Sequence, residues 1–370
     1  MLEWARLRPD DGFVSGLALR LRGPKPTAER LAALVTSRLP RIPALGEHLD
    51  GPAREESWRT ADPFDAADHV HLLEDGSDPD RCAELLANQP IREDRPRWGL
   101  WLIDTGCHNE YLLAYRAHHA AQDGAAVAHT IRHLLDARTP APPAANAPTA
   151  PAPQAPGPLR MSSRLLATAH VPVDAMRAVS RATGASLHDV YLTALAGALR
   201  TWLDPHERAA PVPVRVPFNV RLRHERQDRG NRVGYNRVLL PVNEPHAAHR
   251  LAHIVEQTSA WPRERNRRLL DRAHPDMMWR YALRSVTPGD ALASATMLGI
   301  HTPLALDGAP VIHGTALPPL AAGHMFSTVL FLHAERATIS FTAQNQHQHV
   351  RDLPRLWGRA LDELATATRA

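Results

Sequence analysis

The sequence predicts an α/β fold built from two lobes, and three observations lead to this prediction. The chain has 370 residues, 44% of them hydrophobic, which is enough for a large core in one two-lobed body or in two domains. Apolar runs of strand length alternate with segments of helical periodicity along the whole chain. A stretch made almost only of Pro, Ala, Thr and Gln, residues 139–158, separates 1–138 from 159–370. We expect this stretch to be an extended linker between the lobes.

The first half contains the elements that lead to a pair of histidines. A strand is predicted at 13–21, and a helix follows at about 27–38, where Pro40 ends it. Two further strands, 98–104 and 110–116, are joined by the short turn Thr-Gly-Cys-His-Asn. This hairpin delivers the histidines at its end.

The second half continues the alternation of strands and helices. The predicted strands are 163–170, 212–221, 238–242, 326–332 and 337–342, and the predicted helices are 174–183, 187–202, 246–258, 275–284 and 353–367. Apolar residues repeat at helical spacing over 187–202, which predicts a strongly amphipathic helix. Ser186 and Asp189 at its start form the pattern of a capping box.

The chemistry-bearing residues cluster in one run, His118-His119-Ala-Ala-Gln-Asp123-Gly124, between a buried strand and an apolar-periodic helix. A neutral imidazole, with an ordinary pKa near 6.5, is suited to remove a proton from an attacking heteroatom. Gly124 allows a tight turn and leaves room beside the reacting centre. The histidines could instead be core or capping residues.

A metal site is a second alternative, because His119 and Asp123 could share a helix face. The helix adds two further candidates at the i, i+4 spacing of metal ligands, His129 and His133. They lie opposite the apolar face of the predicted helix, so we expect them to be solvated and to bind no metal.

The pattern His-His-x-x-x-Asp-Gly resembles the active-site motif of the thioester-dependent acyltransferase superfamily. That superfamily includes chloramphenicol acetyltransferase, peptide-synthetase condensation domains and bacterial wax ester synthase/diacylglycerol acyltransferases. The resemblance implies two chloramphenicol-acetyltransferase-like lobes that pack as a V, with an active-site tunnel at their interface. It also implies that His119 is the general base, that His118 orients the turn or lines the tunnel, and that Asp123 forms a structural salt bridge with an arginine elsewhere.

Three other segments resemble the wax ester synthase family. The strand at 212–221 resembles a family strand that ends in the arginine partner, which implies that Arg221 pairs with Asp123 and that Asn219 lies near the substrate. Alternatively, Arg221 is a surface charge at a strand end. Gly-Asn231-Arg-Val resembles a segment that borders the active-site channel, or it is simply a turn. Asp189 lies in a segment like the family's Asn-Asp helix motif, where we favour helix capping over a direct catalytic role but retain it as a substrate-binding candidate.

The sequence departs from the family at several positions, among them His188, where the family's helix motif has asparagine. The Pro-Leu-Trp motif is imperfect, with Arg97 before Trp98, and Ala295-Thr296-Met-Leu-Gly-Ile stands where the family has Ser-Asn-Val-Pro-Gly-Pro. Thr296 is the polar residue that remains to contact substrate or a developing oxyanion. We therefore expect a specialised O- or N-acyltransferase of secondary metabolism. The alternatives are a non-catalytic scaffold that binds a carrier protein or lipid, wax ester or triacylglycerol synthesis, and a histidine-based metal hydrolase.

Composition limits the partners. The net charge of +4 comes mostly from dispersed arginines, which does not indicate nucleic-acid binding but suits coenzyme A or an acidic acyl carrier protein as the donor. The acceptor would be a small alcohol or amine. Two cysteines, no signal-peptide pattern and no membrane-spanning run predict a cytoplasmic protein. We expect no cofactor besides the acyl thioester co-substrate.

Overall fold

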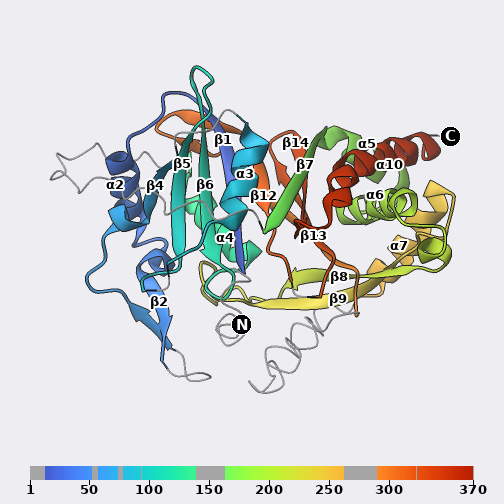
Figure 1. The fold of residues 1–370 in the computed structure, drawn as a ribbon, viewed down its shortest axis with the longest axis horizontal. Helices are drawn as coiled ribbons and strands as arrows, with labels where there is room; N and C mark the ends of the chain where they lie inside the picture. The colour runs from blue at the N-terminus through green and yellow to red at the C-terminus, as the bar shows by residue number, and fades with distance from the viewer. Residues whose placement is uncertain are drawn as a thin grey trace. The chain divides into compact units, whose positions relative to one another are not determined.

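The computed structural model describes residues 13–51, 57–73, 78–92, 94–138, 163–261, 290–321 and 323–369. Their contacts divide them into two units (Figure 1). The first unit takes the described residues up to Ser163 together with His224–Asn231 and Leu298–Pro319, and the second takes the rest. Two segments from the second half of the sequence thus belong to the first unit. The predicted linker 139–158 and the predicted helix 275–284 lie outside the described residues.

The first unit is built on a six-stranded sheet. Its strands, in spatial order, are β11 (Ala305–Leu306), β12 (Ala309–Leu317), β1 (Val14–Arg22), β6 (Glu110–His118), β5 (Trp98–Asp104) and β4 (Val70–Leu73). β1 is antiparallel to both β12 and β6, whereas β4 is parallel to β5. Every residue of β6 except Glu110 is buried, because strands flank it on both sides and side chains cover both faces. β6 is therefore a rigid support for the histidines at its end.

Three helices and a small hairpin complete this unit. They are α2 (Ala28–Arg38), α3 (Pro79–Asn88), α4 (Gly124–Leu134) and the pair β2 (Glu47–Asp50) and β3 (Ser57–Thr60), with short 3-10 helices η2 (Pro43–Gly46) and η3 (Ala66–His69). α4 packs against β1 and β6, and α2 packs against α4 and β4. α2 begins where the Thr27 hydroxyl accepts the Arg30 N–H, as its sequence predicts.

The second unit contains another six-stranded sheet. Its order is β7 (Arg164–Pro172), β14 (Arg336–Gln344), β13 (Phe326–His333), β10 (Ala293–Ile300), β8 (Val212–Asn219) and β9 (Val233–Leu240). β10 runs parallel to β8, and the other strand pairs with a described full register are antiparallel. The segment that stands in place of the family's Ser-Asn motif is therefore part of a strand.

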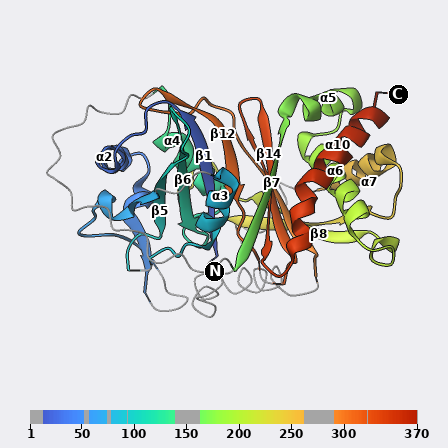
Figure 2. The same cartoon turned by 45° about the horizontal axis from the view of Figure 1, so that its top comes forward.

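The helices of the second unit gather on one side of this sheet (Figure 2). They are α5 (Val173–Thr183), α6 (Leu187–Trp202), α7 (Ala247–Ser259) and α10 (Leu353–Ala367), with 3-10 turns η4 (Glu207–Ala209) and η5 (Gln348–Asp352). α6 contacts α5, α7, α10 and β9, so every residue from Asp189 to Leu199 is buried. The predicted amphipathic helix is thus a central helix, surrounded on all sides. The α/β fold class is confirmed.

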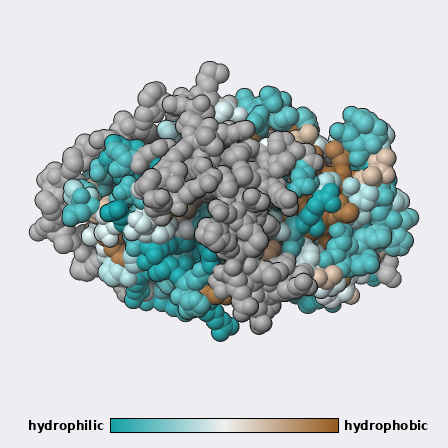
Figure 3. Space-filling view, turned by 90° about the horizontal axis from the view of Figure 1, so that it is seen from below, coloured by the Kyte–Doolittle hydropathy of each residue, from teal (hydrophilic) through white to brown (hydrophobic). Residues whose placement is uncertain are grey.

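The described surface is mainly polar. Hydrophilic side chains make up most of the coloured surface in Figure 3, and large hydrophobic residues are exposed in the described ranges only at Leu72 and Leu239. Of the helices that the structure describes, none has the length and apolar character needed to cross a bilayer.

Candidate active site

The end of β6 fixes the two histidines through backbone hydrogen bonds. His118 is the last residue of β6, and its N–H donates to the Arg97 carbonyl at 2.9 Å. The His119 N–H donates to the Phe13 carbonyl at 2.8 Å. The chain then turns, and the N–H groups of Ala121 and Gln122 both donate to the His118 carbonyl, at 2.8 and 3.0 Å. A tight turn at the end of a buried strand therefore fixes the backbone of both histidines.

His118 is buried in this turn in its neutral form. Its side chain is 8% exposed, and its Nδ1 accepts the Ala120 N–H at 3.2 Å. Burial lowers the pKa of His118 to about 3, and the nearby Arg97 charge adds to this effect. The ring is therefore uncharged at neutral pH and its Nδ1 lone pair is occupied by the turn.

His119 is equally buried but has different partners. Its ring lies against that of Phe13, with centroids 4.7 Å apart and a tilt of 51°. The Asn231 side-chain amide nitrogen lies 2.8 Å from His119 Nδ1 and 3.1 Å from the His119 carbonyl oxygen. Asn231, predicted as a substrate-binding residue, thus contacts the predicted base itself.

Asp123 and Gly124 begin α4 directly after this turn. Asp123 is fully buried and is the N-cap of α4, because its Oδ1 accepts the Ala126 N–H at 3.0 Å. Gly124 is the first helical residue, and a Cβ placed there would lie 3.2 Å from Leu298 Cδ1. The glycine therefore provides room for the Leu298 side chain at the start of α4.

The segment His224–Asn231 braces the turn from the side. Gln122 and Gly230 form a parallel β-bridge, and the Asp123 N–H donates to the Gly230 carbonyl at 3.2 Å. The Gln122 side chain accepts the Tyr115 hydroxyl at 2.6 Å and donates to the Thr130 hydroxyl and the Asp228 carbonyl. Gln122 therefore connects β6, α4 and this segment, and the segment in turn delivers Asn231.

Charged residues anchor the same segment. Asp228 is 3% exposed and accepts the Ala44 N–H at 3.0 Å, and Arg226 binds it through two nitrogens. Burial would raise the pKa of the Asp228 carboxyl, but Arg226 and the Ala44 N–H together hold it below its usual value. Arg226 and Arg229 both reach Glu47.

The alternative of a metal site receives no support from the histidines on α4. Their rings lie 4.3 Å apart, but the Arg132 guanidinium contacts His129 and His133 at 3.3 Å each. A cation in that position disfavours a bound metal ion. Among the described residues, the one group with ligand atoms close enough for a metal is the exposed set Asp204, His206 and Glu207, none of which was predicted as a site residue.

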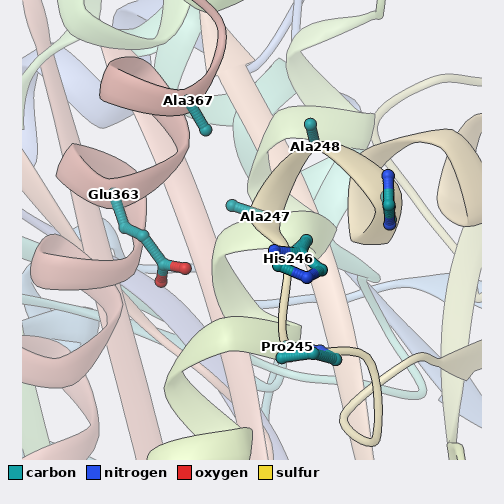
Figure 4. Close-up of a pocket in the computed structure, with 7 residues that line it drawn as sticks. Pro245, His246, Ala247, Ala248, Glu363 and Ala367 are labelled. Atoms are coloured by element: carbon teal, nitrogen blue, oxygen red, sulfur yellow. The ribbon is translucent and has the colours of Figure 1, made fainter.

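A surface cavity of about 480 Å³ lies in the second unit between the start of α7 and the C-terminal part of α10 (Figure 4). Glu363 projects from α10 toward α7, where Ala247 and His246 line the opposite wall. Glu363 also accepts two hydrogen bonds from the buried Arg250. None of the predicted site residues lines this cavity.

Arg221 and Asn219 lie at the end of β8 in the second unit. Arg221 is 5% exposed, so the alternative of a surface charge is wrong. The Asn219 Oδ1 accepts the Arg221 N–H at 2.9 Å and also contacts its guanidinium. Asn219 is itself exposed and fixes the backbone before Arg221. The Asp123–Arg221 pair stays a prediction.

Asp189 and Thr296 also belong to the second unit. Asp189 completes the predicted capping box with Ser186, and its Oδ1 accepts the Thr258 hydroxyl of α7 at 2.7 Å. One carboxylate oxygen thus caps α6 and the other joins α6 to α7, which supports the capping interpretation. Thr296 is half-buried on β10.

A comparison with protein families identifies the family of this chain. The model of the wax ester synthase/diacylglycerol acyltransferase catalytic domain matches residues 12–248, more than half of the chain. The chain belongs to this family. The resemblance inferred from the histidine motif is therefore confirmed.

Relatives of this family member support the assignment. A putative diacylglycerol O-acyltransferase of Mycobacterium tuberculosis H37Rv is 25% identical over 130 residues, which cover 34% of this chain and 28% of the relative. The chain thus spans about a quarter of the length of the first curated relatives that it matches.

Two solved structures share the fold. The wax ester synthase/diacylglycerol acyltransferase of Marinobacter aquaeolei VT8 superimposes with a TM-score of 0.67 at 16% identity, covering 97% of this chain and 95% of that one. The starter condensation domain of rhizomide synthetase, in complex with C8-CoA and Leu-SNAC, gives a TM-score of 0.67 at 13% identity, with 100% and 92% covered.

In this family member, sequence reasoning missed the residues that hold the histidine turn. Gln122 occupies a variable position of the motif, and only its place between a buried strand and a helix could have marked it. Asp228 and Arg226 lie in a charged run that is typical of an exposed loop, but Asp228 is buried. These residues hold the turn through contacts between segments that are far apart in the sequence.

Proposed function

We propose that the chain transfers an acyl group from a thioester to an alcohol or amine, with His119 as the general base. The observation that carries the proposal is the held histidine turn. His119 follows the buried strand β6, and its backbone and its ring are each fixed by a second segment of the first unit. A base held in this way loses little entropy when it meets an acceptor.

The chemistry requires one base that also acts as an acid. His119 takes the proton of the acceptor hydroxyl or amine as that heteroatom forms a bond to the thioester carbonyl carbon. The tetrahedral intermediate then collapses, the carbon–sulfur bond breaks, and the protonated imidazole returns the proton to the leaving thiolate. The products are an ester or amide and a free thiol. No acyl-enzyme is needed, because the proton is the only group that the protein holds between the two steps.

The proposed donor and the proposed class of acceptor are taken from what is known of similar proteins. A condensation domain with this fold was solved with C8-CoA, and the relatives in sequence are described as diacylglycerol O-acyltransferases. Acyl-coenzyme A is therefore the first donor to test, and an acyl carrier protein is the second. We favour a specialised ester or amide product over storage lipid, because the Ser-Asn and Pro-Leu-Trp motifs of the family are altered here.

The test is thiol release from acyl-coenzyme A donors of increasing chain length, with fatty alcohols, a diacylglycerol and small amines as acceptors. We expect acceptor-dependent release from the wild type and a loss of about 100-fold or more in His119→Ala, the usual contribution of a general base. His129→Ala is the matched control, since it removes a histidine from α4 outside the turn. Equal rates in wild type and His119→Ala would refute the proposal.

A binding scaffold without catalysis is the second candidate, favoured by the altered segment Ala295–Ile300, which lacks the family's Ser-Asn pair and is part of β10. It predicts that neither coenzyme A nor carrier-protein donors release thiol, while acyl-coenzyme A still binds in calorimetry with equal affinity to wild type and His119→Ala.

A further inference from the structure

The amide of Asn231 contacts His119 in a way that determines where the imidazole carries its proton. The Asn231 Nδ2 lies 2.8 Å from the ring Nδ1 and 3.1 Å from the backbone carbonyl oxygen of the same histidine. The backbone oxygen can only accept, so it fixes the amide with its NH₂ group toward His119. The second amide hydrogen then points to Nδ1, which must accept it.

We propose that Asn231 is a positioning residue that holds His119 in the tautomer protonated on Nε2. A neutral imidazole carries one N–H, and a nitrogen that accepts a hydrogen bond is the one without it. The inference rests on the proposed function only for its catalytic consequence, because the tautomer is a property of the resting protein.

The placement of Asn231 is built into the first unit. Its neighbour Gly230 is bridged to Gln122, and Asp228 two residues earlier is bonded to Ala44 and Arg226. Gly230 has a φ of +79°, a conformation that favours glycine, and it turns the chain immediately before Asn231. The amide is thus brought to the ring by a segment anchored on both the histidine turn and the η2 region.

The consequence for acyl transfer is that the His119 ring must change its tautomer before it can act as the base. In the Nε2–H tautomer, Nε2 can donate a hydrogen bond but cannot take a proton. To act as a base at Nε2, the ring must move its proton to Nδ1, and the Asn231 amide must turn its oxygen toward that nitrogen. The turned amide loses its bond to the His119 carbonyl, a cost of about 1 kcal/mol, so both states are accessible. Asn231 therefore controls how often His119 is ready to accept a proton.

Two variants separate this role from simple packing. Asn231→Asp offers only acceptor oxygens, so it should hold the Nδ1–H form with Nε2 ready as the base. It should also raise the apparent pKa of the acidic limb of kcat/KM by about one unit, since a carboxylate favours the imidazolium. Asn231→Ala removes the hydrogen bond that favours the Nε2–H form, so more molecules have Nε2 free to accept a proton and kcat should rise about threefold with a smaller change in KM. Loss of simple packing would lower kcat instead. Asn88→Ala, which removes an amide bonded to Glu84 in α3, is the matched control.

The decisive measurement is ¹⁵N NMR of histidine-labelled full-length protein near neutral pH, with the His119 signals assigned from the His119→Ala variant. We expect an unprotonated Nδ1 and a protonated Nε2 in the wild type, the reverse in Asn231→Asp, and a mixture in Asn231→Ala. The same tautomer in wild type and Asn231→Ala, or an Nδ1–H form in the wild type, would overturn the inference. Because the spectra need no substrate, the tautomer result stands or falls independently of whether thiol release is observed.

Discussion

The N-termini of α4 and α6 are both capped with the help of an aspartate, but the two aspartates lie in different surroundings. Each helix start contains a buried aspartate. Asp123, 0% exposed, is the N-cap of α4 and accepts the Ala126 N–H, whereas Asp189, 6% exposed, is the third residue of α6 and accepts the N–H of the N-cap Ser186. Such a cap stabilises a helix by supplying acceptors for its first N–H groups. Within its own helix, each aspartate therefore has a capping role.

Their surroundings differ. The Asp189 carboxylate bonds to Ser186 in its own cap and to the Thr258 hydroxyl on α7, so it joins two helices of the second unit. Asp123 follows a turn in which His119 is held by Phe13 and Asn231, and its own N–H binds Gly230. An acid at a helix start therefore does not indicate a reactive site. The preceding residues distinguish the two, because Asp123 follows the histidine turn whereas Asp189 follows only the Ser186 cap.

The largest expected effect comes from replacing each aspartate with asparagine. Asp123→Asn keeps an oxygen for the Ala126 N–H but removes a negative charge from the turn that would stabilise a protonated His119. We expect kcat/KM for thiol release to fall about 100-fold with a small change in stability. Asp189→Asn cannot accept from Ser186 and Thr258 together, so unfolding should become easier by about 2 kcal/mol with near-normal activity per folded molecule.

Asp174→Asn is the control for this pair, because Asp174 lies in the first turn of α5 and its side chain is 70% exposed. It should change neither rate nor melting temperature measurably. If Asp189→Asn lost activity while it retained its stability, Asp189 would have to be assigned a direct role and the distinction between the two helix starts would fail.

The stability of the fold at low pH gives a second test, because the core of the first unit contains buried histidines that are neutral. His69 is 2% exposed, stacks on Trp98 at 4.2 Å and contacts the Trp98 carbonyl through Nδ1, and burial lowers its pKa to about 4. A group with a lowered folded-state pKa contributes fully above its ordinary value of 6.5, and this contribution is lost as the pH falls toward 4. The loss approaches about 3 kcal/mol for one such group.

We therefore expect the melting temperature to fall steadily between pH 6.5 and 4, and His69→Phe, which keeps a ring against Trp98, to flatten this slope. Calorimetry of both proteins across that range measures the effect. An unchanged slope in His69→Phe would show that other groups carry the acid sensitivity, and a stability that increases toward pH 4 would contradict the sign.

Local patterns predicted most of the fold. Helices such as 353–367 and strands such as 326–332 have periods and caps that short-range physics determines, and the structure places α10 and β13 there. β12 was not predicted, because its pairing with β1 joins residues about 300 positions apart, as in the register Gly16↔Leu317. The amphipathic interpretation of α6 was wrong for a related reason, since small and polar residues such as Thr193 and Gly197 are buried by helices that only the tertiary structure brings together.

In the candidate site, too, the features set by local sequence were predictable and those set by distant contacts were not. The motif contained His118, His119, Asp123 and Gly124 in a single run, so their proximity was predictable. The different partners of the two adjacent histidines were not, because each lies outside the run: Arg97 near His118 and Asn231 at His119. Residues that brace the turn, such as Gln122, carry no pattern by which a sequence alone could distinguish them.

The smallest expected effect compares one glycine in each helix. A Cβ at Gly197 in α6 would lie 2.8 Å from the Ala360 Cβ, which cannot move without shifting α10. Overpacking of this kind costs about 1–3 kcal/mol, partly offset by the roughly 1 kcal/mol helix preference of alanine over glycine.

At Gly124 the nearest atom is the Leu298 Cδ1 at 3.2 Å, the end of a flexible side chain that can rotate away. Gly197→Ala should therefore lower the melting temperature by about 4 °C, whereas Gly124→Ala should change it by less than about 2 °C. Thermal unfolding of the two variants checks the comparison. A larger loss at Gly124 would mean that Leu298 is locked in place, and that the start of α4 is packed as rigidly as the centre of α6.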